Sequence, residues 1–190
     1  MRVLIACEYS GAARDAFRAR GHDALSCDLL PSETPGPHYQ GPVQDILGDG
    51  WDLMIAHPPC THLAVSGARW FAGKQAEQAE ALAFVRLLLA APIARIALEN
   101  PVSVISSRIR KPDQVIQPWQ FGHEATKTTC LWLKGLPHLT PTNIVGKGAR
   151  HVTKSGKSLP QWYNLPPSAD RWKIRSATFQ GIADAMAEQW

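Results

Sequence analysis

The sequence RVLIACEYSGAARDAFRARGHDALSCDL, residues 2–29, contains one complete alternation of strand, helix and strand. Residues 2–7 are mostly aliphatic and indicate a short buried strand. Residues 11–20 have helical spacing, with two alanines and a phenylalanine on one face, and Gly21 is a natural stop for that helix. Residues 24–29 indicate a second strand. Strand, helix and strand in this order predict a parallel β-α-β unit.

The same alternation continues for most of the chain. The helix expected at residues 75–91 carries leucines, alanines and a valine at helical spacing, and Pro92 ends it. Further strands are expected at residues 52–56, 93–98 and 129–133, and a closing amphipathic helix is expected at residues 176–190. We therefore expect an α/β fold, with a Rossmann-like, doubly wound and mostly parallel sheet covered by helices.

Two segments depart from this alternation. Residues 31–42 carry four prolines and predict an irregular loop. Residues 134–173 lack periodicity and contain several glycines and basic residues, which we interpret as a basic, irregular insertion. Loops this long inside a compact domain usually have a function. A length of 190 residues suits one hydrophobic core, so we expect residues 1–190 to form a single domain.

The net charge of +4 is distributed unevenly along the chain. Residues 1–100 hold 8 Lys and Arg against 11 Asp and Glu, a net charge of −3. Residues 101–190 hold 12 against 5, a net charge of +7. A basic half next to a neutral or acidic one favours a cofactor-binding part beside a surface that faces a polyanion. A solvated basic tail is the alternative.

Composition also bears on location and on metal binding. No apolar run approaches the roughly 20 residues of a membrane span, and the N-terminus does not resemble a signal peptide, so we expect a cytoplasmic protein. The four cysteines form no CxxC pair, which argues against a disulfide scaffold and a zinc ribbon. A metal site at His57, Cys60 and His62 is the alternative, but no second ligand pair is apparent. We expect no bound metal ion.

Doubly wound sheets bind ligands at the carboxyl ends of their strands. After the first expected strand, Tyr9, Ser10 and Gly11 form a turn where a backbone can approach a nucleoside cofactor. Asp28 ends the second strand and can accept hydrogen bonds from ribose hydroxyls, and Asp45 can accept from an adenine amino group. A plain turn and two capping aspartates are the alternative. Their succession at strand ends favours a cofactor pocket.

The strand at residues 52–56 leads into a rigid turn, Pro58-Pro59-Cys60. Consecutive prolines fix the backbone, so Cys60 is held in one pose. An inert packed cysteine is the alternative, but such a cysteine rarely follows a rigid turn at a ligand-binding edge. Glu99 ends a later apolar strand, where burial can raise the pKa of its carboxyl and make it a proton donor. A nucleophile and an acid at strand ends suggest covalent catalysis on a ring activated by protonation.

With these residues, the chain resembles the S-adenosylmethionine-dependent DNA cytosine carbon-5 methyltransferases, in a compact form found among phage-encoded proteins. The matching elements are Tyr9-Ser10-Gly11, Asp28, Asp45, Pro58-Pro59-Cys60 and Glu99-Asn100-Pro101. The resemblance covers residues 2–102 in order, with weaker similarity at residues 126–135 and 175–187. The Pro-Cys and Glu-Asn elements carry its specificity, whereas the glycine turn is common to many proteins.

The resemblance implies a single catalytic domain with the class I methyltransferase fold and S-adenosylmethionine as cofactor. The implied cofactor-binding residues are Tyr9, Ser10, Gly11, Asp28, Asp45, Pro58 and Ser176. By the same resemblance, the Cys60 thiolate adds to carbon 6 of cytosine, Glu99 protonates ring nitrogen 3, and carbon 5 takes the methyl group. A helix N-terminus or a nearby cation would lower the pKa of this thiol. Pro59, Asn100 and Lys127 are the implied substrate-binding residues, and a base in duplex DNA would have to be flipped out.

The chain departs from the family in three places. The strand that normally carries two arginines reads TKTTCL at residues 126–131, so Lys127 is the candidate replacement for the arginine that contacts the base. The late Gly-Asn element that helps hold the cofactor is replaced by RSAT at residues 175–178. The separate target-recognition domain is missing, which leaves only residues 134–173 to recognise a DNA sequence.

The predicted function is methyl transfer to carbon 5 of cytosine in DNA. Two alternatives remain open: the same chemistry on a deoxycytidine mononucleotide, and an inactive nucleic-acid-binding module. Retention of both Cys60 and Glu99 disfavours the inactive module. A phosphate-binding loop at Gly156-Lys157-Ser158 is rejected because His151 stands where its first glycine is required. The target sequence and the oligomeric state stay open.

Overall fold

A mixed β-sheet forms the centre of the molecule. In the computed structural model, which describes residues 1–169 and 171–190 and leaves out the side chain of Trp70, seven strands form this sheet in the order β3-β2-β1-β4-β5-β7-β6. The strands are β1 (Arg2–Ala6), β2 (Asp23–Asp28), β3 (His38–Gln40), β4 (Leu53–Ala56), β5 (Arg95–Pro101), β6 (Gln114–Ile116) and β7 (Thr129–Lys134). Strands β1 to β5 are parallel, whereas β7 runs antiparallel to both β5 and β6.

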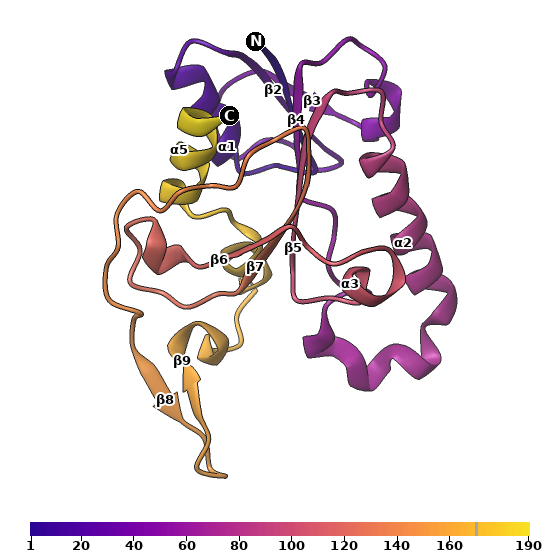
Figure 1. Cartoon of the computed structure of the whole chain (residues 1–190). Coiled ribbons are helices and arrows are strands. Elements are labelled where there is room, and N and C mark those ends of the chain that lie inside the picture. The colour runs from indigo at the N-terminus through magenta and orange to yellow at the C-terminus, as the bar shows by residue number, and fades with distance from the viewer. Residues whose placement is uncertain (170) are drawn as a thin grey trace.

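Helices cover both faces of the sheet (Figure 1). The α-helices are α1 (Ala12–Ala19), α2 (Gln75–Leu89), α3 (Ile105–Arg108), α4 (Arg171–Ser176) and α5 (Gln180–Gln189). Helices α1 and α5 lie together on one face, and α2 and α3 lie on the other. Short 3-10 helices occur at η1 (Val43–Asp45), η2 (Val65–Gly73), η3 (Pro118–Gln120) and η4 (Gln161–Asn164). Among the described residues, every helix is too short or too polar to cross a membrane.

Strand β1 shows why the sheet is buried on both sides. Successive side chains of a strand point to opposite faces. Val3 and Ile5 belong to the core cluster under α1 and α5, whereas Leu4 and Ala6 belong to the cluster under α2, and all four are fully buried. A strand covered on both faces needs an apolar residue at every position, which explains the aliphatic run at the N-terminus.

The α/β prediction is confirmed, and the sheet order identifies the ligand-binding edge. The order of the strands reverses between β1 and β4, which is the topological switch point where open α/β sheets bind ligands. Strand β5 differs in extent from the prediction, because it begins at Arg95 and continues to Pro101. Antiparallel pairing of Asn100 with Cys130 and of Pro101 with Thr129 extends it. Glu99 and Asn100 therefore lie within a hydrogen-bonded strand, not after one.

Three predictions about irregular or helical segments are corrected. The loop at residues 31–42 contains β3, which pairs with β2. The segment at residues 134–173 contains an antiparallel hairpin of β8 (Arg150–Val152) and β9 (Ser158–Pro160). The helix expected at residues 176–190 begins later, as α5 at Gln180, and is preceded by a separate short helix α4 that ends at Ser176. Strands of three residues are too short to show an alternating pattern, so their tertiary pairing alone defines them.

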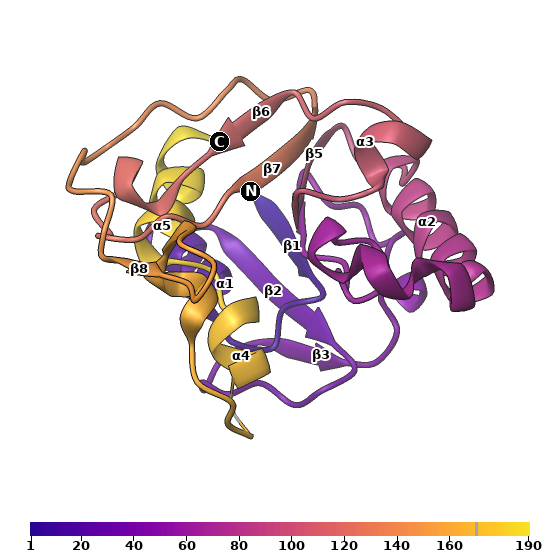
Figure 2. The ribbon, with the colours of Figure 1, turned by 90° about the horizontal axis from the view of Figure 1, so that it is seen from below.

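The hairpin β8–β9 projects from the body of the molecule. It extends at the end toward which the parallel strands run (Figure 1). Seen from that end, the hairpin and α4 lie on one side of the sheet and the segment between β4 and α2 lies on the other (Figure 2). The carboxyl edge of the sheet is thus flanked by two elements outside the central β-α-β units.

Candidate active site

Cys60 is exposed on a turn that two hydrogen-bonded connections hold at the carboxyl edge of the sheet. The side-chain amide Nδ2 of Asn100 in β5 donates to the carbonyl of Pro58 at 2.9 Å. Beyond the turn, the backbone N–H groups of Leu63 and Ala64 donate to the carbonyl of Cys60 at 3.0 and 2.9 Å. Because both sides of Cys60 are tied, its backbone is fixed. The residue is exposed, but neighbouring groups partly desolvate its sulfur.

Glu99 lies on the neighbouring strand β5, and its carboxylate is partly buried. Its Oε2 is 3.3 Å from Nδ1 of His57, the residue that follows β4. Burial by itself raises the pKa of Glu99, but the hydrogen bond from His57 and the positive charge of Lys127 outweigh it, so the pKa is lowered. The sequence-based expectation of a raised pKa is wrong in the free protein, because both partners come from other segments of the chain.

The pKa of the Cys60 thiol is raised, contrary to the expected lowering. Burial of the sulfur contributes most, and the negative charge of Glu99 adds to it. Lys127 and Arg175 act in the opposite direction and do not compensate. The expected cation, Lys127, is therefore present, but it also stabilises the negative charge of Glu99, and that charge disfavours the Cys60 thiolate. In the free protein, Glu99 carries the negative charge and Cys60 keeps its proton.

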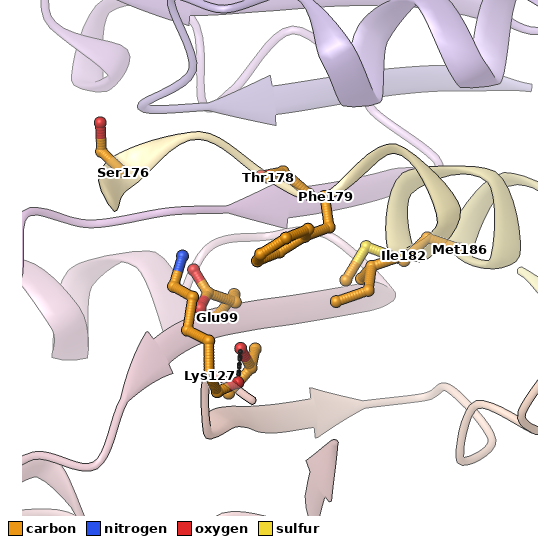
Figure 3. Close-up of a pocket in the computed structure, with 8 residues that line it drawn as sticks. Glu99, Lys127, Ser176, Thr178, Phe179, Ile182 and Met186 are labelled. Atoms are coloured by element: carbon orange, nitrogen blue, oxygen red, sulfur yellow. Dashed lines mark hydrogen bonds between the residues drawn. The ribbon is translucent and has the colours of Figure 1, made fainter. Parts of the chain in front are cut away.

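Lys127 extends beside Glu99, as Figure 3 shows. Its Nζ donates to the carbonyl of Arg175 at 3.0 Å. The same Nζ lies 5.5 Å from the ring centre of Trp162 and 5.7 Å from that of Phe179. Cation–π contacts and a carbonyl acceptor thus hold the ammonium group near the carboxylate. A small pocket at this point is lined by Glu99, Lys127, Thr129, Ser176, Thr178, Phe179, Ile182 and Met186.

Tyr9 and Ser176, both predicted to bind a cofactor, are in contact although they lie far apart in sequence. The phenolic oxygen of Tyr9 is 2.9 Å from Oγ of Ser176. The ring of Tyr9 also lies 5.7 Å from the ring of Trp172 in α4. The turn after β1 is therefore covered by the segment that leads into α5.

Gly11 has a positive φ of 79°, which a glycine adopts without strain. A Cβ at this position would collide with Oγ1 of Thr34 and with the side chain of Arg14. The space that a side chain at this position would need is thus occupied by Thr34 of the loop after β2 and by Arg14 of α1. Arg14 is fully buried, and its guanidinium donates to Ser32 and Thr34 of that loop at 3.0 and 2.7 Å.

Glu8 and Cys7 are site features that the sequence analysis missed. The buried carboxylate of Glu8 accepts hydrogen bonds from the backbone N–H groups of Ala13 at 2.7 Å and Arg14 at 3.2 Å, and so caps α1. Cys7 has a φ of 59°, in the left-handed region that costs a side chain strain energy. Such strain concentrates at functional sites. The position of Glu8, shortly before the start of the predicted helix, could have indicated that its carboxylate binds the first helix amides. No pattern in the sequence indicates the backbone conformation of Cys7.

Asp28 and Asp45 each use one carboxylate oxygen inside the protein. Oδ1 of Asp28 accepts from the backbone N–H of Leu30 at 2.9 Å, and Oδ2 of Asp45 accepts from the hydroxyl of Tyr39 at 2.8 Å. The bond of Asp28 closes a local turn after β2. Among the residues described, neither remaining oxygen accepts a hydrogen bond from the protein. These two oxygens fit the hydroxyl and amino donors of a nucleoside cofactor.

The site predicted from the sequence is largely assembled at one edge. The turn at Tyr9–Gly11 follows β1, Asp28 ends β2, Pro58–Cys60 follows β4, and Glu99 and Asn100 lie near the end of β5. Asp45 lies farther out, in η1 after the edge strand β3. In the described part of the chain, no three His, Cys, Asp or Glu side chains are grouped as a metal ion would require.

Fold and site together define a Rossmann-like α/β protein with a cysteine after β4 and a carboxylate near the end of β5, at the carboxyl edge of its sheet. No protein-family model matches the chain, and no curated protein matches its sequence. In fold, it is similar to a candidate DNA modification methyltransferase encoded within a prophage (E. coli), with a TM-score of 0.51 and 16% identity. The match covers 78% of this chain and 53% of that chain, so this chain spans about half of its length. At this identity the likeness is one of fold.

Proposed function

We propose that the protein is an S-adenosylmethionine-dependent methyltransferase that acts on carbon 5 of cytosine in DNA through a covalent adduct with Cys60. The observation that carries the proposal is the placement of Cys60 on a fixed turn, near enough to the Glu99 carboxylate for its charge to act on the thiol. A nucleophile that adds to a ring and a carboxyl that can protonate it are the two groups this reaction needs. The likeness in fold to a candidate DNA modification methyltransferase supports it.

The protonation states of the pair account for the first step. In the free protein the thiol holds one proton and the carboxylate holds none, as the directions of their pKa shifts indicate. When the sulfur of Cys60 bonds to carbon 6, the thiol loses that proton, the electrons of the 5,6 double bond move toward carbon 5, and ring nitrogen 3 gains a proton. Glu99 is the carrier that can deliver a proton to nitrogen 3. The proton that the Cys60 thiol loses can therefore pass to the Glu99 carboxylate and from there to ring nitrogen 3.

S-adenosylmethionine, when bound, would supply an electrophilic methyl group to carbon 5, with its S–CH3 bond breaking and S-adenosylhomocysteine leaving. The residues proposed to hold this cofactor are Tyr9, Ser10, Gly11, Asp28, Asp45, Pro58 and Ser176. The uncommitted oxygens of Asp28 and Asp45 support that assignment. Release of product needs a base to remove the carbon-5 proton, departure of the Cys60 thiolate, and return of the nitrogen-3 proton to Glu99.

Lys127, Asn100 and Pro59 have separate roles in the proposal. The ammonium of Lys127 lies where it acts on both Glu99 and Cys60, so it is the group that offsets the negative charge of the adduct step. Asn100 positions the turn through its bond to Pro58 and acts through Cys60. Pro59 is exposed beside Cys60 and is proposed to contact the base.

The direct test incubates the protein with methyl-labelled cofactor and either duplex DNA or dCMP. Digestion of the product should yield labelled 5-methyl-deoxycytidine, and Cys60→Ser should abolish the label while leaving the circular dichroism spectrum unchanged. Label on adenine, or transfer that persists in Cys60→Ser, refutes the mechanism. Label on dCMP alone replaces DNA by the mononucleotide as substrate.

A second test traps the adduct. A duplex with 5-fluorocytosine at the target cannot lose a proton from carbon 5, so the sulfur–carbon bond should persist after methyl transfer. Mass spectrometry should then find the modified base on the peptide that contains Cys60. An adduct on Cys7, or none at all with a wild-type protein that methylates ordinary DNA, contradicts the assignment of Cys60.

A further inference from the structure

The hairpin β8–β9 is a ribbon with unusual exposure. Its three-residue strands pair only with each other, through Arg150 and Pro160, His151 and Leu159, and Val152 and Ser158. The face that carries Val152 is open to solvent, with Val152 71% exposed, whereas His151 on the other face is half-buried. A two-stranded ribbon is marginally stable without further packing. Exposure of this kind is typical of an element whose second surface comes from a partner.

The tip of the ribbon is nonetheless ordered by its own hydrogen bonds. The N–H of Thr153 donates to the carbonyl of Lys157 at 2.9 Å, and the N–H of Gly156 donates to the carbonyl of Thr153 at 2.9 Å. Oγ1 of Thr153 also accepts from the N–H of Lys157 at 3.1 Å. Lys154 and Lys157 are both exposed. They are therefore presented from a fixed backbone at the outer end of the ribbon.

The charge of this region has one sign. Residues 125–169 contain six Lys and Arg and no Asp or Glu. The six are Lys127, Lys134, Lys147, Arg150, Lys154 and Lys157. An ordinary solvated surface mixes both signs, whereas a stretch without acidic residues favours a polyanion.

The base of the ribbon is joined to the candidate active site. Helix η4 follows β9 directly, and its Trp162 ring lies 5.1 Å from the ring of Phe179. Lys127, which faces Glu99, lies over the same Trp162 ring. Because the ribbon also projects beyond the carboxyl edge of the sheet (Figure 1), a partner held along it would lie against the edge that carries the candidate active site.

We propose that the β8–β9 ribbon enters the major groove of duplex DNA beside the target base, with Lys154 and Lys157 on backbone phosphates. This inference rests on the proposed function, which makes DNA the substrate. The major groove is wide enough for a two-stranded β-ribbon. Single strands are instead held by exposed aromatic rings on which bases stack, and residues 150–160 contain no Phe, Tyr or Trp.

The test measures binding of a fluorescent 20-base-pair duplex as a function of salt. Lys154→Gln/Lys157→Gln should lower the affinity roughly ten-fold at moderate salt and reduce the slope of log K against log salt by about two, because each lost phosphate contact removes about 0.9. The matched control is Arg18→Gln/Lys111→Gln, which removes the same charge. Arg18 is exposed in the last turn of α1, which leads into the amino end of β2, and Lys111 is exposed in the segment between α3 and β6. The control should keep the wild-type slope.

Three results overturn the inference. These are a slope in the ribbon variant equal to that of the control, tighter binding of single strands than of duplex, and displacement by netropsin, a ligand that fills the minor groove. Binding is measured without cofactor, so its outcome is separate from methyl transfer. A wild-type protein that shows the ribbon-dependent slope but transfers no methyl group refutes the proposed function and leaves the ribbon as a DNA-binding element.

Discussion

At the scale of single residues, the chemistry of the site depends on how one negative charge is shared. The charge of Glu99 raises the pKa of the Cys60 thiol, and Glu99 stays charged because His57 and Lys127 both favour its charged form. The thiol is consequently less nucleophilic in the free protein than an isolated cysteine.

Replacing Glu99 by Gln should therefore make the thiol of Cys60 more reactive. Burial raises the pKa of the Cys60 thiol above 9.0, and the charge of Glu99 raises it further. Removing that charge therefore lowers the pKa of the thiol. The alkylation rate of Cys60 with iodoacetamide, followed by mass spectrometry from pH 7 to 10, should show a midpoint shifted to lower pH in Glu99→Gln. Lys127→Gln should shift the midpoint in the opposite direction. An unchanged midpoint in both variants contradicts the coupling.

The same carboxylate should make stability depend on pH in acid. Burial raises the pKa of Glu99, but the bond from His57 and the charge of Lys127 bring it below the ordinary 4.5. A pKa that is lower in the folded than in the unfolded state stabilises the protein above about pH 4.5, and this contribution is lost as the pH falls through the folded value.

Urea unfolding of wild type and Glu99→Gln should therefore differ most near pH 6 and converge as the pH is lowered below 4.5. Glu77→Gln, which changes an exposed carboxylate on α2, is the control for the substitution itself. A difference between wild type and Glu99→Gln that grows in acid would show that the direction is wrong.

At the scale of elements, two glycine turns with the same backbone conformation differ in what packs against them. Gly11 and Gly156 have the same φ of 79°, yet one faces Thr34 and Arg14 and the other faces open space within 4 Å. The first turn anchors the loop after β2 over α1, and the second ends a free ribbon. An alanine at Gly156 would therefore test the cost of the backbone conformation alone, whereas an alanine at Gly11 would add the cost of a steric clash.

Gly156→Ala should lower the free energy of unfolding by about 1–2 kcal/mol, which is the cost of a side chain in the left-handed region. Gly11→Ala should cost about 1–3 kcal/mol more, because the added methyl also overpacks the contact with Thr34. Chemical denaturation of both variants measures this difference. Equal losses would mean that the loop moves away from Gly11 without cost.

At the scale of the whole molecule, Trp190 joins three segments of the chain. Trp190 is 8% exposed, its Nε1 donates to the carbonyl of Pro137 at 3.0 Å, and its own carbonyl accepts from Arg95 at 3.1 Å. It closes the core between α5, the start of β5 and the segment after β7. This contact joins the C-terminal helix to the sheet.

Trp190→Ala should lower the free energy of unfolding by about 3–5 kcal/mol, in the range of buried tryptophan truncations. Trp172→Ala is the matched control, because that ring is 51% exposed and its removal opens less buried space. Thermal and urea unfolding of the two variants should rank them in this order. A loss at Trp190 no greater than at Trp172 would show that α5 contributes little to the core.

The sequence by itself determined the alternation of strands and helices and the order of residues at the strand ends. Local periodicity encodes the first, and the second follows because parallel strands share one carboxyl edge. This was enough to predict the fold class and to place Cys60, Glu99 and Asn100 on neighbouring strands β4 and β5 or the turns beyond them.

Only the tertiary structure decided which charged and polar side chains lie close together. His57 approaches Glu99, Lys127 reaches it from before β7, and Ser176 reaches Tyr9, and none of these pairs is local in sequence. The direction of a pKa shift depends on such neighbours, which is why the expected shifts of Cys60 and Glu99 were both wrong. The ribbon β8–β9 was also hidden, since strands of three residues carry no period and acquire their identity only when they pair.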